Sequence, residues 1–146
     1  MKKVLIYILL ALLALIVIPI AFLGLRIAFD LENPMRQSNE QIRADLLELT
    51  PIGMSIEDIV QVIASNEKWK VDYVNYDHGV YMGELGYPDD PEDYALKKMT
   101  VRGEKSIRAT IGGYTNFYMT FVDVWWAFDE DSKLIEIFVK KAKIGL

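Results

Sequence analysis

Two segments near the C-terminus, residues 117–128 and 134–141, place apolar side chains at every second position. Because successive side chains of a strand point to opposite faces of a sheet, this period indicates β-strands. The segment "DEDSK" between them is short enough for a hairpin loop, so the two strands should pair antiparallel. Further strand candidates, each bounded by turn residues, are 69–76, 98–102 and 106–112. The pattern predicts an antiparallel sheet of about four strands.

The two faces of this predicted sheet differ in composition. One face is almost purely apolar and collects Met99, Val101, Ile107, Ala109, Ile111, Val122, Val124, Trp126, Phe128, Ile135, Ile137 and Val139. The other face mixes charges with aromatic rings and collects Lys98, Arg102, Arg108, Thr110, Phe121, Asp123, Trp125, Glu136, Phe138 and Lys140. An antiparallel sheet covered by helices on one side leaves its second face toward solvent. We therefore expect helices on the apolar face and an open mixed face.

Two short helices are predicted before the sheet. The first covers residues 39–49, with Ser38 as its N-cap. The second follows Ser55-x-x-Asp58, which resembles a capping box with Asp in place of Glu. It carries an apolar stripe, and at about three turns it is too short to persist alone in water, so it should lie on the sheet. The stripe consists of Ile56, Ile59, Val60 and Ile63. The expected fold class is α+β, with both helices packed on one face of the antiparallel sheet.

The N-terminal run from Val4 to Leu25 contains no charged residue. As a helix it would measure roughly 33 Å, which is enough to cross the hydrocarbon core of a bilayer. Lys2 and Lys3 precede it, and the positive-inside rule then places the N-terminus in the cytoplasm. A cleaved export signal is the alternative. We predict a single-pass protein of the cell membrane, with a transmembrane helix as anchor over residues 1–29, a linker over 30–38 and an extracytoplasmic α+β domain over 39–146.

The charge distribution and the lack of cysteine exclude several function classes. Three of the 16 basic residues lie within residues 1–29, which contain no acid, so the remainder has 13 basic against 21 acidic residues. An acidic domain repels phosphate backbones, and we expect no nucleic-acid partner. The absence of cysteine excludes disulfides, thiolate nucleophiles, cysteine zinc sites and N-terminal lipid attachment.

No sequence pattern indicates catalysis, a cofactor or a small-molecule substrate. His78, the only histidine, follows Asp77 and could act as a base or ligand, but a turn position accounts for it better. The acidic segments 88–93 and 129–132 could hold Ca²⁺, yet they lack the glycine and final glutamate of a Ca²⁺-binding loop and are expected to be solvated. The Gly-Gly pair within 110–117 should bend a strand, because no Lys-Ser/Thr follows it as in a phosphate-binding loop. We predict no metal site, no cofactor and no enzymatic activity.

Short motifs in this order of elements resemble those of a known family. Gly53-Met54-Ser55 opens a helix with Ile59 at the following apolar position, and "WWAFDEDSKLIEI" reads as an aromatic strand, an acidic turn and a final strand. In these respects residues 40–141 resemble the SmpA/OmlA-type domain of outer-membrane assembly lipoproteins, which shares its fold with the β-lactamase-inhibitor proteins. That family's lipid-bearing cysteine and the Gly-x-Pro after its helix are absent. The resemblance implies a helix pair packed on a sheet, and it suggests an inhibitor-like role.

The mixed face of the sheet is the strongest functional candidate. Aromatic rings and arginine are favoured at the centres of protein interfaces. We therefore predict that a protein partner binds Arg108, Phe121, Asp123, Trp125, Glu136, Phe138 and Lys140. The alternative is that segment 73–87 folds over the sheet and buries these rings. The predicted function is a membrane-anchored extracytoplasmic protein-binding module, with an inhibitor or immunity-like protein as one version; an envelope scaffold and a carboxylate-based hydrolase are the alternatives.

Overall fold

The computed structural model describes residue 6 and residues 13–25, 32–85, 100–115 and 118–144. The chain divides into two compact units, Met1–Arg36 and Gln37–Leu146. The first unit contains a helical run over residues 13–25 and the 3₁₀ turn η1, Pro34–Arg36. All other described helices and strands belong to the second unit.

The described residues of the N-terminal segment, residue 6 and residues 13–25, bear on the predicted transmembrane helix. No helix of the described residues is both long enough and apolar enough to cross a membrane. The predicted transmembrane helix is therefore wrong for the described part of the chain. The other residues of the predicted anchor and linker, 1–5, 7–12 and 26–31, lie outside the described residues, and the extracytoplasmic location, which follows from that helix, stays a prediction.

The helices α2, Asn39–Leu49, and α3, Ile56–Ser65, form the predicted pair. Each begins with a serine whose side chain accepts a hydrogen bond from a backbone N–H of the first turn, Ser38 from Gln41 and Ser55 from Asp58. Each helix buries one apolar stripe. The buried residues are Ile42 and Leu46 in α2, and Ile56, Ile59 and Ile63 in α3.

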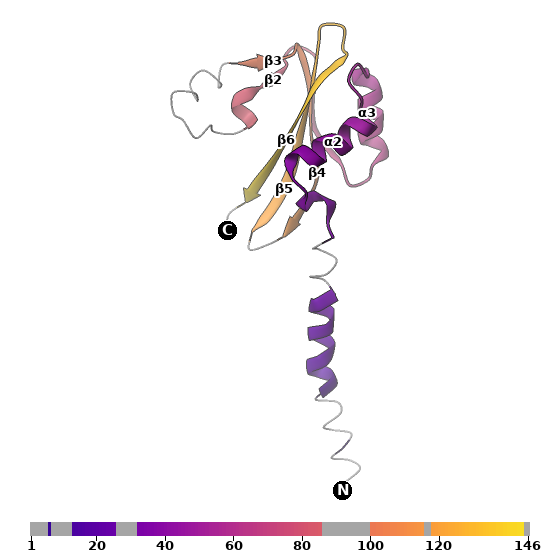
Figure 1. Ribbon diagram of the computed structural model, residues 1–146, viewed down its shortest axis with the longest axis vertical. Coiled ribbons are helices and arrows are strands. Elements are labelled where there is room, and N and C mark those ends of the chain that lie inside the picture. The colour runs from indigo at the N-terminus through magenta and orange to yellow at the C-terminus, as the bar shows by residue number, and fades with distance from the viewer. Residues whose placement is uncertain (1–5, 7–12, 26–31, 86–99, 116–117, 145–146) are drawn as a thin grey trace. The chain divides into compact units, whose positions relative to one another are not determined.

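Four strands form the main antiparallel sheet: β1 (Lys70–Asn75), β4 (Lys105–Thr115), β5 (Met119–Phe128) and β6 (Leu134–Ile144). Their order is β1-β4-β5-β6, so β1 and β6 are the two edges (Figure 1). The predicted hairpin joins β5 to β6. α2 packs against β6 and α3 against β1, both on one side of the sheet (Figure 1). The α+β class, the antiparallel sheet and the helix pair are therefore confirmed.

The core between the sheet and the helices follows the predicted alternation. Its fully buried sheet residues are Ile107, Ala109, Ile111, Val122, Val124, Trp126, Phe128 and Ile137. Trp126 Nε1 donates a hydrogen bond to Thr50 Oγ1 at 3.1 Å, and Thr50 Oγ1 donates to the Leu46 carbonyl oxygen at 2.8 Å. These bonds pair the polar atoms buried in this core and link the C-terminal end of α2 to the sheet.

A bulge moves Ile135 off its predicted face. The pairing of β5 with β6 shifts register between Ala127 and Phe128, so that Phe128 lies opposite Leu134. Ile135 then packs against a buried cluster that contains Trp125, on the face away from the helices. Leu134 takes its place in the helix-side core and is 1% exposed. The prediction for Ile135 is wrong because one extra residue in a strand reverses the alternation of side chains.

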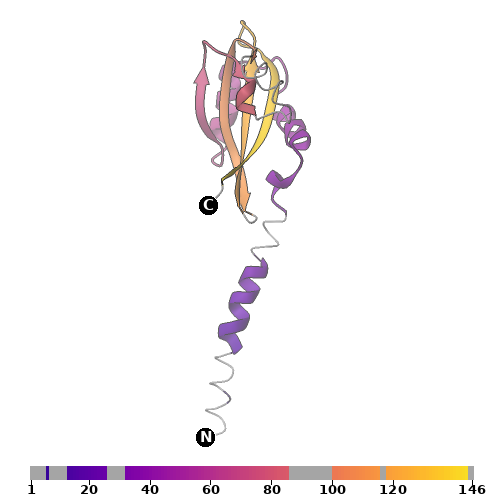
Figure 2. The ribbon, with the colours of Figure 1, turned by 90° about the vertical axis from the view of Figure 1, so that its left-hand side faces the viewer.

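A small second layer covers part of the other face. β2 (Val80–Tyr81) pairs with β3 (Val101–Arg102), and the 3₁₀ turn η2 (Met82–Leu85) follows β2. η2 lies in front of the main sheet in Figure 2, on the side away from the helices. β2 contacts β5, and η2 contacts β6. The predicted strand 98–102 thus holds only for Val101–Arg102, which pair outside the main sheet; Lys98 and Met99 lie outside the described residues.

Candidate functional site

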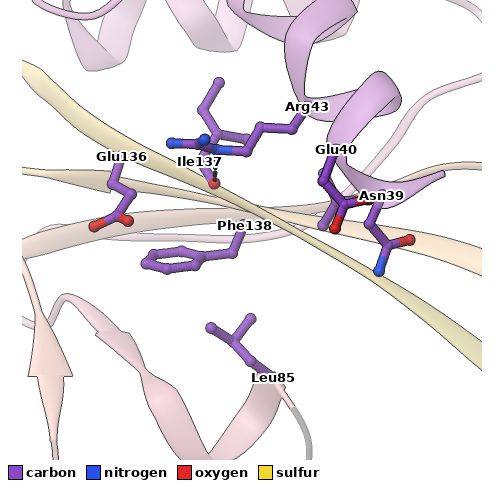
Figure 3. A pocket seen from close by; sticks show the side chains of 8 residues that line it. Asn39, Glu40, Arg43, Leu85, Glu136, Ile137 and Phe138 are labelled. Carbon is purple, nitrogen blue, oxygen red and sulfur yellow. Dashed lines mark hydrogen bonds between the residues drawn. The ribbon is translucent and has the colours of Figure 1, made fainter.

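A groove of about 370 Å³ follows the β6 edge of the main sheet. Its lining comes from α2 with Asn39, Glu40 and Arg43, from η2 with Leu85, and from β6 with Glu136, Ile137, Phe138 and Val139. In Figure 3 the α2 side chains lie on one side of β6, and the Phe138 ring and Leu85 lie on the other. The β6 backbone therefore lies between a polar wall and an apolar wall.

Arg43 belongs to the polar wall because α2 buries the neighbouring Ile42 against the sheet. The next residue on a helix points about 100° further round, which here is toward the edge strand. Arg43 Nε donates a hydrogen bond to the Ile137 carbonyl oxygen at 2.8 Å, the dashed line in Figure 3. The Arg43 guanidinium thus occupies one backbone acceptor on this edge of the sheet. An edge strand without such cover can pair with another chain.

The apolar wall is formed by Phe138 and Leu85, which point toward each other in Figure 3. Both are half-buried, and both pack against the buried cluster of Val80, Trp125 and Ala127. Val80 is fully buried, so its burial fixes the start of η2 against the sheet. The apolar wall therefore depends on the second layer of the fold.

Every second residue of β6 directs its N–H and C=O away from β5, toward this groove. In an antiparallel ladder, residues alternate between bonding to the neighbouring strand and directing N–H and C=O away from it. The Ile137 carbonyl points away from β5, because it accepts its bond from Arg43. By the same alternation, the N–H and C=O of Val139 and Lys141 point to the free side. Within the described residues, no strand pairs with that side of β6.

The structure brings two of the seven predicted partner-binding residues into the groove, Glu136 and Phe138. Glu136 Oε2 also accepts a hydrogen bond from Arg102 Nε at 2.6 Å. Phe121 and Lys140 are half-buried on the same face of the sheet and do not line the groove. The remaining three predicted residues contact one another on that face: Asp123 and Trp125, which are buried, and Arg108, which is half-buried.

Trp125 corrects the prediction of an open aromatic face. Its side chain is 1% exposed, because the second layer packs over it. The central guanidinium carbon of Arg108 lies 4.9 Å from the centre of the Trp125 ring, within the range of a cation–π contact. The alternative expectation, that segment 73–87 buries these rings, therefore holds for Trp125 over the described part of that segment, residues 73–85.

Asp123 is buried in a polar network on the same face. Its Oδ2 accepts a hydrogen bond from Arg108 Nη2 at 3.0 Å, and its Oδ1 accepts one from Thr110 Oγ1 at 2.8 Å. Arg108 Nε lies 3.5 Å from Asp72 Oδ2 of β1 and makes no hydrogen bond within the described residues. Asp123 is only 6% exposed, so its carboxylate serves this internal network, and its predicted exposure is wrong.

Glu40 gives the polar wall a stabilised negative charge. Its pKa is lowered from the ordinary value of 4.5, chiefly by a hydrogen bond from its own backbone N–H and then by the Ser38 side chain, with Lys141 adding a weaker attraction. Glu40 lies in the first turn of α2, where free N–H groups and the helix dipole favour an anion. At neutral pH the polar wall therefore carries both a carboxylate and the Arg43 guanidinium.

The residues that the sequence offers as possible metal ligands do not lie close together within the part of the chain that the structure describes. No group of three or more His, Asp or Glu side chains there could hold a metal ion. His78 is exposed, and its ring centre lies 6.2 Å from that of Tyr81. Asp129 Oδ1 accepts a hydrogen bond from the Lys133 N–H inside the hairpin turn. The acidic segment 88–93 lies outside the described residues.

Sequence reasoning missed six of the eight residues that line the groove. They are Asn39, Glu40, Arg43, Leu85, Ile137 and Val139, of which the last two were predicted on the apolar face. Arg43 directly follows the buried stripe position Ile42, which is a signal that its side chain borders the packed face. That signal becomes useful only once β6 is known to be an edge. Leu85 is an apolar residue just before the acidic segment 88–93, and such a residue can indicate a local anchor.

No family model matches this sequence, and no curated protein or solved structure matches it significantly. The resemblance to the SmpA/OmlA-type domain and the β-lactamase-inhibitor proteins stays a prediction.

Proposed function

We propose that this chain is a protein-binding module that docks a protein partner along the β6 edge. The observation that carries the proposal is a strand edge without a neighbouring strand among the described residues, set between the two walls of a groove. In strand addition, main-chain hydrogen bonds supply affinity and the adjoining pockets supply specificity. Val139 and Lys141 supply the main-chain groups.

The walls of the groove support selective binding. Arg43 and Glu40 carry opposite charges on one side, and Leu85 and Phe138 offer apolar surface on the other. Complementary charges fix the orientation of a partner, and buried aromatic surface contributes to its affinity. Lys141 Nζ donates to the Gln37 carbonyl oxygen, which holds the end of β6 to the start of α2. A docking strand held in this way loses little conformational entropy on binding.

Site-specific photo-cross-linking tests the proposal in cells that express the full chain. A photoreactive phenylalanine analogue replaces Glu40, which is exposed and lines the groove. The matched control carries the same analogue at Glu57, which is exposed in the first turn of α3. Irradiation should join a protein to position 40 and not to position 57. Equal adducts at the two positions, or no adduct at position 40, would contradict docking at β6.

A further inference from the structure

We infer that the β6 edge pairs with the β6 edge of a second copy of this chain, in one register centred on Phe138. The inference rests on the docking edge proposed above. Within β6, Glu136 and Lys140 stand at equal distances on either side of Phe138. In an antiparallel pairing about a two-fold axis at Phe138, each residue faces its counterpart across that centre. Glu136 of each copy then faces Lys140 of the other.

The backbone is compatible with this register. Ile137 and Val139 both direct their N–H and C=O to the free side of β6, and they lie opposite each other when the axis passes through Phe138. Each such pair of residues can exchange two N–H···O bonds. If the register slid by one residue, the axis would pass between two residues. Backbone groups that point to the free side of one copy would then face groups of the other copy that point to its own β5. A shift of the axis to Ile137 or Val139 would preserve the backbone bonds but separate both Glu–Lys pairs.

The side chains favour a second copy as the occupant through charge complementarity. Glu136, Phe138 and Lys140 alternate onto the face away from the helices, so the two opposed ion pairs would flank the facing Phe138 rings. Opposite charges directly across two strands are favourable, and like charges are unfavourable. Glu136 and Lys140 are both half-buried, which limits screening by solvent. The contact of Glu136 with Arg102 already orients its carboxylate.

One existing bond opposes this pairing. The Ile137 carbonyl oxygen accepts from Arg43 Nε, and in the paired state it would accept from Val139 of the second copy. The guanidinium must therefore move aside in both copies. The dimer is accordingly expected to be weak and dependent on concentration, with Arg43 competing for the same acceptor.

Charge exchange between copies tests the register. Glu136→Lys leaves Lys140 facing a lysine, and Lys140→Glu leaves Glu136 facing a glutamate, so each variant should dimerise at least about tenfold more weakly than the native chain. An equimolar mixture of the two variants restores opposite charges at both positions and should recover dimerisation. Glu67→Lys, which makes the same charge change in an exposed turn, is the matched control.

The measurement is sedimentation velocity on the full chain in a non-ionic detergent, because the N-terminal helix exposes Leu15, Ile18 and Phe22. Weak dimerisation of each single variant and recovery in the mixture support the inference. A native chain that stays monomeric at about 1 mM, or a mixture that stays as monomeric as its components, overturns it. Those outcomes leave the proposed function separately testable, since cross-linking at position 40 to a different protein would still support docking at β6.

Disulfide cross-linking through an introduced cysteine is a second test of the β6–β6 register. The chain contains no cysteine, so a single introduced thiol can link only to its copy. Phe138→Cys should form a disulfide-linked dimer on mild oxidation, because residues facing each other across antiparallel strands lie within disulfide range. Glu67→Cys, in an exposed turn, should not. Equal linkage at both positions would overturn the register.

Discussion

Arg43→Ala should change the stability of the monomer and its association in opposite directions. A hydrogen bond from a charged donor contributes about 1.5–3 kcal/mol when shielded from water. Arg43 is an exposed side chain that reaches the Ile137 carbonyl oxygen at 2.8 Å, and solvent screening reduces its contribution to about 1 kcal/mol. The free energy of unfolding should fall by that amount. Pairing displaces this bond in both copies, so its removal spares about 2 kcal/mol and should tighten the dimer about 30-fold.

Two assays on the full chain measure these opposite effects. Urea denaturation followed by circular dichroism reports the free energy of unfolding, and sedimentation velocity reports the dimer dissociation constant. Glu48→Ala, on an exposed position of α2 outside the groove lining, should change neither quantity. A dimer that is unchanged or weaker in Arg43→Ala would refute the idea that the guanidinium competes for this carbonyl.

Three further predictions concern the elements that build the groove. Thr50→Val leaves the buried Trp126 Nε1 without its acceptor and should lower the free energy of unfolding by about 1–3 kcal/mol in urea denaturation; no loss would show that another acceptor serves it. Val80→Ala should cost about 2 kcal/mol and shift tryptophan fluorescence to longer wavelength as Trp125 gains solvent; an unchanged spectrum would contradict this packing. The lowered pKa of Glu40 means that its carboxylate stabilises the fold above pH 4.5, and this contribution is lost as the pH falls through its folded pKa. The melting temperature of Glu40→Gln should therefore be lower than that of the native chain at pH 7 and equal to it in acid. A difference in melting temperature that does not change with pH would contradict this stabilising role of the Glu40 carboxylate.

The elements that the sequence predicts correctly are those that local chemistry determines. Ser38 and Ser55 cap the two helices at the expected positions, because a cap depends on residues within one turn. The alternation along β5 and β6 predicts which side of the sheet the helices cover. Both signals need only neighbouring residues, and no information on how strands are ordered.

The second layer could not be predicted in the same way. Val80 and Leu85 belong to a segment without periodicity, yet both pack with Trp125. The bulge that displaces Ile135 arises where β5 and β6 meet the hairpin, and a period-2 reading assumes that no such extra residue exists. The transmembrane prediction rested on the length and apolar composition of residues 4–25, and no helix among the described residues is long and apolar enough to match it.

The candidate site depends on strand order, which no local pattern encodes. Glu136 and Phe138 belong both to the predicted surface and to the groove. The alternation of side chains along the strand is enough to predict that they lie on the mixed face. Arg108 and Asp123 are used internally because β1 and β5 bring acids to either side of β4. Arg43 acquires its role only because β6 is an edge.

Amide hydrogen exchange along β6, resolved by NMR at each residue, tests the docking edge most directly. In dilute solution the N–H groups of Ile137 and Val139 should exchange quickly because they face the free side, while those of Phe138 and Lys140 point toward β5 and should exchange slowly. At high concentration Ile137 and Val139, which face each other in the proposed register, should become protected in the native chain and stay unprotected in Glu136→Lys. If these two N–H groups are already as protected as their neighbours in dilute solution, or if concentration leaves them unchanged, β6 does not dock a second chain.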